Sequence, residues 1–129
     1  MKLVLIGLGG AIGAMSRYVV SGLDYRYTYG ALPIGTLVVN LSGSFIIGML
    51  WAIFEIVSVS SNVRLFLLIG ILGGFTTFSS FALENFNLLR DGEKTTVILY
   101  VVLSNLVGIA LVYVGYVVAK AIASLLKGF

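Results

Sequence analysis

The residues best placed to do chemistry form an uncharged stretch from Gly73 to Phe81, which reads Gly-Gly-Phe-Thr-Thr-Phe-Ser-Ser-Phe. Glycine costs about 1 kcal/mol relative to alanine inside a helix, and serine and threonine side chains compete for backbone hydrogen bonds. We therefore expect a helix to break here. Within a membrane, a break is tolerated only where it is buried in protein or lines a wet cavity, and the freed backbone groups then suit ion binding.

The phenylalanines of this stretch recur every third residue, so the rings of Phe75, Phe78 and Phe81 lie along one side. Packing is the ordinary use of such a stripe. The ring edges also carry partial positive charge and can hold an anion without a formal charge. Because hydroxyls both donate and accept hydrogen bonds, the residues leave an anion and a cation equally open.

Two further lines of polar and small residues recur at intervals of four, which places each line on one helical face. They are Thr36, Asn40, Ser44 and Gly48 in one segment, and Tyr100, Ser104 and Gly108 in another. A single polar residue often only joins two membrane helices, but an amide without partners in lipid is costly. Asn40 is therefore predicted to serve a pathway or an interface, and the two lines suggest a hydroxyl-lined track.

The elements that position these residues follow from the composition. The 129 residues are 60% hydrophobic and 10% charged, with mean hydropathy +1.13, whereas a soluble domain has about 25% charged residues. A membrane-crossing helix needs about 20 mostly apolar residues. The spacing of the charges predicts an all-α membrane protein of a single domain, 1–129, in a lipid bilayer. Its four helices are expected at roughly 2–22, 34–57, 63–89 and 95–123, with the third interrupted.

The first helix contains the glycine-rich run Gly7 to Gly13, whose third glycine falls one place late for a dinucleotide-binding turn. Gly9 and Gly13 instead predict a small-x-x-x-small face, along which two helices approach closely. A cleavable signal peptide is the competing interpretation, and we disfavour it because no A-x-A site ends the segment. The helix reaches membrane length only by including Arg17, which either snorkels to the headgroups or faces a wet cavity and handles ions.

The sequence lacks the residues that several classes of function require. The chain has no cysteine and no histidine, and most of its five carboxylates lie beside expected helix ends. Thiol chemistry is excluded and general acid–base catalysis lacks its usual groups, so we expect no enzyme. The eight basic residues form no cluster, which gives no indication of nucleic-acid binding.

The basic residues also bear on orientation, which follows the excess of Lys and Arg on the cytoplasmic side. With four spans, one side carries Lys2, Arg64, Lys120 and Lys127, and the other carries Arg17, Arg26, Arg90 and Lys94. This balance predicts that the chain inserts both ways and pairs with an inverted copy of itself.

Over nearly its whole length the chain resembles the small Fluc (CrcB) fluoride channels. The matching motifs are Gly9 to Ala14 with Arg17, Gly35 to Asn40 with Gly43, Gly73 to Phe81 with Glu84, and Ser104 with Gly108. The resemblance implies a passive fluoride-selective ion channel of the cell (inner or plasma) membrane, which exports fluoride from the cytoplasm and lowers its toxicity. It also implies an antiparallel (dual-topology) homodimer with two pores and a structural sodium ion at its centre.

The resemblance also assigns residues to roles. The backbone carbonyls of Gly73 and Thr76 match the sodium ligands, and Phe78 and Phe81 match the aromatics whose edges face fluoride. The polar pathway matches Asn40, Ser79, Ser80, Tyr100 and Ser104, with Arg17 and Glu84 towards its mouths. Ser80 stands where the family pattern has threonine, so it keeps the hydroxyl and loses a methyl group.

The alternative function is a small multidrug-type exporter, which also has four short helices and is often of dual topology. Such transporters resemble proton exchangers that need a carboxylate deep in the first helix. No carboxylate is present between residues 2 and 22, which disfavours this alternative.

Overall fold

The computed structural model describes residues 1–22 and 32–127, and every regular element in this part of the chain is a helix. Four helices are long and apolar enough to cross a membrane: Lys2–Ser21, Ile34–Ile56, Ser61–Arg90 and Lys94–Leu126. We call them spans one to four. The prediction of an all-α membrane protein with four spans is confirmed. Arg26, which entered the charge balance, lies outside the described residues.

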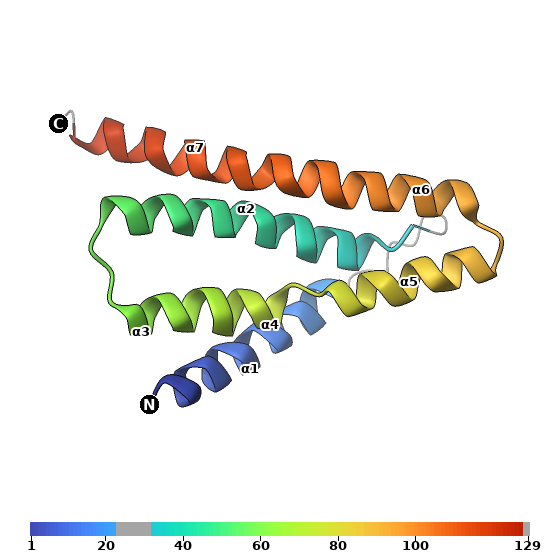
Figure 1. The fold of residues 1–129 in the computed structure, drawn as a ribbon, viewed down its shortest axis with the longest axis horizontal. Coiled ribbons are helices and arrows are strands. Elements are labelled where there is room, and N and C mark those ends of the chain that lie inside the picture. Colours follow the sequence, from blue (N-terminus) through green and yellow to red (C-terminus); the bar gives the residue numbers. More distant parts are fainter. Residues whose placement is uncertain (23–31, 128–129) are drawn as a thin grey trace.

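The spans differ in how continuous they are. Span one is α1 (Lys2–Ser21) and span two is α2 (Ile34–Ile56). Span three consists of α3 (Ser61–Arg64), the π-helix η2 (Leu65–Leu72), α4 (Gly73–Phe75) and α5 (Phe78–Arg90). Span four consists of α6 (Lys94–Val102), the π-helix η3 (Leu103–Val107) and α7 (Gly108–Lys127). In Figure 1, α2 runs between span four and span three, and α1 crosses span three close to α4.

Two helix ends differ from the expected positions by more than one residue. Span three begins at Ser61 rather than residue 63, because the Ser60 hydroxyl accepts a hydrogen bond from the Val63 amide at 3.4 Å and caps the first turn. The final helix continues to Lys127 rather than ending at residue 123. Alanine and leucine, which are strong helix formers, dominate its last turns.

Short connections make neighbouring spans antiparallel. At the end of α2, the Arg64 guanidinium donates to the Phe54 carbonyl at 2.9 Å and lies 5.3 Å from the centre of the Phe54 ring. Between spans three and four, Gly92 has a φ of 83°, which the absence of a Cβ makes accessible. The Glu93 amide then donates back to the Leu88 carbonyl at 2.8 Å. The first connection is therefore held by a contact between spans two and three, and the second by a hydrogen bond back to the end of span three.

Spans one and three pack backbone against backbone. A Cβ placed on Gly9 would lie 2.9 Å from the Gly70 Cα, and one placed on Gly74 would lie 3.0 Å from the Gly10 Cα. A Cβ on Gly13 would lie 2.8 Å from the Phe75 amide nitrogen. The predicted small-residue face of Gly9 and Gly13 is therefore confirmed, and its partner is the span that carries the break.

Spans two and four form a second close pair. A side chain on Gly48 would meet the Val112 backbone, and one on Gly115 would meet the Phe45 backbone. At the same interface, the Ser44 hydroxyl lies 3.6 Å from the position of a Cβ on Gly108. Ser44 of one predicted polar line thus meets Gly108 of the other, whereas Asn40 bonds to span three. The two glycine-packed pairs meet where span two contacts the broken part of span three.

Candidate ion pathway at the broken helix

The interruption of span three falls on Thr76 and Thr77. Both have extended backbones, with φ −76° and ψ 154° at Thr76 and φ −147° and ψ 119° at Thr77. The predicted break in the third helix is confirmed. The chain resumes a helix at Phe78, where the Thr77 hydroxyl accepts a hydrogen bond from the Ser80 amide at 3.2 Å and caps α5.

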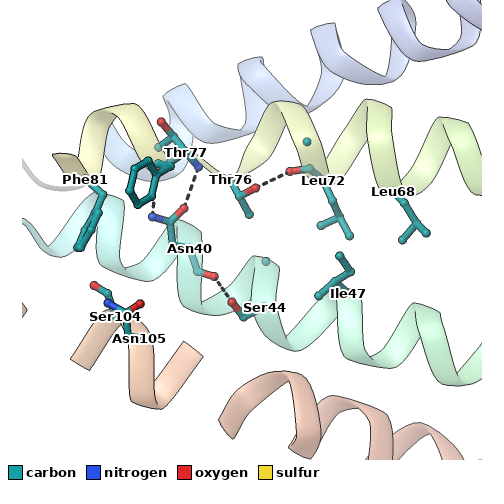
Figure 2. Close-up of a pocket in the computed structure, with 13 residues that line it drawn as sticks. Asn40, Ser44, Ile47, Leu68, Leu72, Thr76, Thr77, Phe81, Ser104 and Asn105 are labelled. Carbon is teal, nitrogen blue, oxygen red and sulfur yellow. Dashed lines mark hydrogen bonds between the residues drawn. The ribbon is translucent and has the colours of Figure 1, made fainter. Parts of the chain in front are cut away.

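Asn40 supplies the hydrogen bonds that the broken helix lacks. Its Nδ2 donates to the Thr77 carbonyl at 2.9 Å, and the Thr77 amide donates to its Oδ1 at 2.8 Å (Figure 2). Thr77 is only 7% exposed, so water is a poor substitute for this partner. One side chain of span two therefore satisfies both backbone groups of a residue in span three, as membrane depth requires.

Because the Thr77 and Ser80 amides bond to side chains at the break, two backbone carbonyls lose their usual helical hydrogen bonds. In a continuous helix the Thr77 amide would donate to the Gly73 carbonyl, and the Ser80 amide would donate to the Thr76 carbonyl. Here the Thr77 amide donates to Asn40 and the Ser80 amide to the Thr77 hydroxyl. The carbonyls of Gly73 and Thr76, the two expected metal ligands, thereby lose their helical donors.

Arg17 reaches this break from span one. Its Nη1 lies 3.5 Å from the Thr76 carbonyl oxygen, which is a long contact for a hydrogen bond. The side chain is half-buried. The guanidinium thus lies beside the freed Thr76 carbonyl, but Arg17 is not among the described residues that line the cavity below, and its role stays a prediction.

A cavity of about 430 Å³ lies beside the break, between spans two, three and four (Figure 2). Six of the predicted site residues line it: Asn40, Gly73, Thr76, Phe78, Phe81 and Ser104. Ser44, Thr77 and Asn105 add polar atoms, while apolar residues such as Ile47 and Leu72 close its other walls. No charged side chain is among the lining residues that the structure describes.

The Ser104 hydroxyl is the least satisfied polar group of this cavity. Its Oγ is buried and has no hydrogen-bond partner within the described part of the chain. A buried hydroxyl without a partner is unusual and calls for a ligand or ordered water. The Ser104 hydroxyl therefore keeps one O–H donor and two acceptor lone pairs without a partner among the described residues.

The rings of Phe78, Phe81 and Tyr100 form a row of neighbouring aromatic side chains that begins at the cavity. The ring centres of Phe78 and Phe81 are 5.7 Å apart and inclined at 44°, and those of Phe81 and Tyr100 are 5.0 Å apart and inclined at 61°. Phe78 is 78% exposed in the single chain, whereas Tyr100 is fully buried. The tilted arrangement leaves ring edges, rather than only faces, available to a small ion.

The remaining predicted residues lie outside the cavity lining. Glu84 accepts hydrogen bonds from the Thr36 hydroxyl at 2.6 Å and the Tyr100 hydroxyl at 2.7 Å, so its carboxylate joins spans two, three and four. The Thr77 hydroxyl donates to the Ser80 hydroxyl at 3.1 Å and lies 3.3 Å from the Ser79 hydroxyl. These contacts form a polar network that continues from the break into α5.

Sequence reasoning missed the part played by the Thr77 backbone and the presence of Asn105 in the cavity. Spacing at intervals of four predicts which residues share one face of a helix. It does not predict which backbone group of another helix, here that of Thr77, lies against that face. Asn105 follows Ser104 directly, so a regular helix would turn it away from the line that contains Ser104. The presence of polar Asn105 within an apolar span was the feature of the sequence that could have indicated its place in the cavity.

The fold and the site together define a small four-span membrane protein whose third span is broken beside an uncharged polar cavity. The family model described as CrcB-like protein, Camphor Resistance (CrcB) matches residues 4–116. The chain therefore belongs to the CrcB family, and the resemblance seen in its motifs is confirmed.

Relatives share nearly the full length of the chain. A protein of Parabacteroides distasonis named fluoride-specific ion channel FluC is 43% identical over 127 residues, which cover 98% of this chain and 99% of that protein. Proteins of the same name are 42% identical over 123 residues in Magnetococcus marinus (95% and 100% covered) and 37% identical over 118 residues in Aquifex aeolicus (91% and 95% covered).

The clamp between Asn40 and Thr77 predicts a large loss of stability in Asn40→Leu. The substitution keeps the approximate shape but leaves two backbone groups of Thr77 without partners, at about 1–3 kcal/mol for each buried group. Thermal unfolding in detergent should show a lower midpoint. Ser42→Ala is the matched control, because the Ser42 hydroxyl bonds only within its own helix, to the Val38 carbonyl at 2.7 Å and the Val39 carbonyl at 3.1 Å. Equal midpoints for the two variants would contradict the clamp.

Proposed function

We propose that this protein is a passive fluoride-selective ion channel of the cell (inner or plasma) membrane, and that it exports fluoride from the cytoplasm and thereby lowers its toxicity. The observation that carries the proposal is the cavity at the break, which has no charged side chain in its described lining. There the Ser104 hydroxyl, which has no partner in the described part of the chain, lies with the Phe78 and Phe81 rings. The names of the relatives in three bacteria point to the same ion.

The chemistry of the cavity suits a small, strongly hydrated anion. A pore must replace the water around such an ion and still release it. Hydroxyl groups, amide N–H groups and ring edges supply partial positive charge in several places, so no single one binds too strongly. A formal cation in a site of low dielectric would bind an anion far more tightly. Arg17 contacts the Thr76 carbonyl and does not line the cavity.

The proposal includes an antiparallel homodimer with two pores. The equal division of basic residues between the two sides supports insertion in both orientations. The cavity supports a partner as well, because one of its walls includes Phe78, which the single chain leaves largely exposed. A second, inverted copy on this face would enclose polar atoms that lipid cannot satisfy.

A structural sodium ion at the dimer centre also forms part of the proposal. Carbonyl oxygens of an interrupted helix are typical sodium ligands in membrane proteins. The released carbonyls of Gly73 and Thr76 are such oxygens, and two copies would supply four of them. Sodium would add a fixed positive charge between the copies. The residues of this chain contribute the break, the Asn40 clamp that maintains it, and the orientation of the two carbonyls.

The multidrug-type exporter remains the weaker alternative. Span one has no carboxylate, and both carboxylate oxygens of Glu84 already accept hydrogen bonds from other spans. An exporter that exchanges protons needs a carboxylate free to bind and release them.

The first prediction of the proposed function is that purified protein in liposomes releases fluoride down its concentration gradient and excludes chloride. A fluoride electrode measures the efflux, with protein-free liposomes and an ionophore as controls. Efflux should persist without a proton gradient, which separates a channel from a proton-coupled exporter. No efflux where the ionophore control works would refute the proposed function.

The second prediction concerns the aromatic rings. Phe78→Ile and Phe81→Ile should each reduce fluoride flux about tenfold or more, because each removes the edge of one ring. The dimer should persist on size-exclusion chromatography. Phe86→Ile is the matched control, since Phe86 lies in the same helix, is 60% exposed and does not line the cavity. Wild-type flux in both cavity variants would remove the rings from the mechanism.

Sodium dependence is the third prediction. Replacement of all sodium by a large organic cation, N-methyl-D-glucamine, should impair folding or conduction. Thr76→Val should keep this dependence, because the Thr76 hydroxyl donates to the Leu72 carbonyl at 2.9 Å and the expected ligand is the backbone carbonyl. If fluoride flux and the melting temperature are the same in sodium and in N-methyl-D-glucamine, the result would count against the Gly73 and Thr76 site.

Orientation in cells gives the fourth prediction. A reporter fused to the C-terminus should be detected on both sides of the membrane, in comparable amounts. Adding two lysines after Lys127 should bias the population towards one side, since basic residues favour the cytoplasm. A single sidedness in the unmodified protein would argue against dual topology.

A further inference from the structure

Asn105 is a polar residue of span four that no motif above accounts for. It lies in η3 (Leu103–Val107), well inside the span Lys94–Leu126. The apolar side chains around it face outward in the single chain, with Leu106 65% and Ile109 71% exposed. An amide among such residues is costly at membrane depth unless it meets a polar partner.

Asn105 reaches the cavity from within the π-helical turn η3. Neighbouring residues of an α-helix point about 100° apart, so Ser104 and Asn105 would ordinarily face different surroundings. A π-turn is wider and inserts a residue into the helical face, and such turns are frequent at functional sites. Both Ser104 and Asn105 line the same cavity here (Figure 2).

The hydrogen bonds of Asn105 leave part of its amide available. Its Nδ2 donates to the Val101 carbonyl at 2.8 Å, which fixes which end of the amide faces its own helix. The second N–H of that nitrogen remains for another acceptor. The neighbouring Ser104 hydroxyl is buried and has no partner among the residues that the structure describes. Two adjacent residues thus present two neutral donors to one cavity. Asn40, by contrast, is held by Thr77 at both ends of its amide.

We propose that Asn105 is a further pathway residue, which donates its second amide N–H to the anion as the anion passes the Ser104 hydroxyl. This inference rests on the proposed fluoride conduction. Two neutral donors on one turn would replace two water molecules of the hydrated ion. Both donors belong to the π-helix η3, which therefore positions the two side chains that would contact the anion.

The test compares Asn105→Leu, which removes the donor at similar size, with Asn105→Gln, which keeps an amide. Fluoride efflux from liposomes should fall about tenfold or more in Asn105→Leu, because a hydrogen bond to a charged group is lost. Asn105→Gln should retain most of the flux. Ser42→Ala is the control for a polar residue of an apolar span outside the cavity, and it should conduct like the wild type. Asn105→Ala serves in the same comparison if Asn105→Leu does not assemble.

Each outcome distinguishes this inference from the function on which it rests. Wild-type flux in Asn105→Leu or Asn105→Ala, with a conducting wild type, would overturn the inference alone. Equal loss in the Leu and Gln variants would also overturn it, because side-chain shape rather than donation would then matter. Loss of the dimer together with flux in all the substitutions would make Asn105 a contact between copies instead. A wild-type protein that releases no fluoride would overturn the proposed function and the inference together.

Discussion

The hydrogen bonds between Asn40 and Thr77 are the interaction on which the rest of this structure depends. Inside a bilayer, a peptide group that leaves its helix finds no water, so the break in span three requires a protein partner. Asn40 provides both a donor and an acceptor at distances of 2.9 and 2.8 Å. Because Asn40 belongs to span two, the break in span three is stabilised by a contact between the two spans. The two released carbonyls and the cavity lie beside this contact.

Close glycine packing keeps this arrangement in place. Span one contacts the turns just before the break through Gly9 and Gly13, and span two contacts span four through Gly48 and Gly115. Backbones at such distances leave little room for sliding. The groups with formal charge are then held at the periphery of the cavity, Arg17 by the Thr76 carbonyl and Glu84 by two hydroxyls. The cavity itself remains neutral and polar, which is the condition under which an anion can be both accepted and released.

The sequence was sufficient to predict the spans and the break because both depend on local composition. Charges separate the apolar stretches, and the run from Gly73 to Phe81 combines weak helix formers with competing hydroxyls. Long-range partners could not be predicted in this way. A four-residue interval placed Asn40 on a face, but the backbone of Thr77 opposite it lies 37 residues away. Asn105 was missed for a related reason, because the interval assumes a regular helix and the π-turn changes the register of span four.

The same physical requirement extends beyond one chain. Within the chain, lipid cannot satisfy the Thr77 peptide, so Asn40 does. On the cavity side, the Ser104 hydroxyl has no partner among the described residues, and the Gly73 and Thr76 carbonyls have lost their helical donors. Acyl chains on this face would leave these groups as poorly satisfied as an unclamped break. These groups are better satisfied by an enclosing surface that retains water or ions, such as the second copy in the proposed dimer. The break thus accounts for the internal clamp, and the groups it leaves on the cavity side are the ones that the proposed partner would enclose.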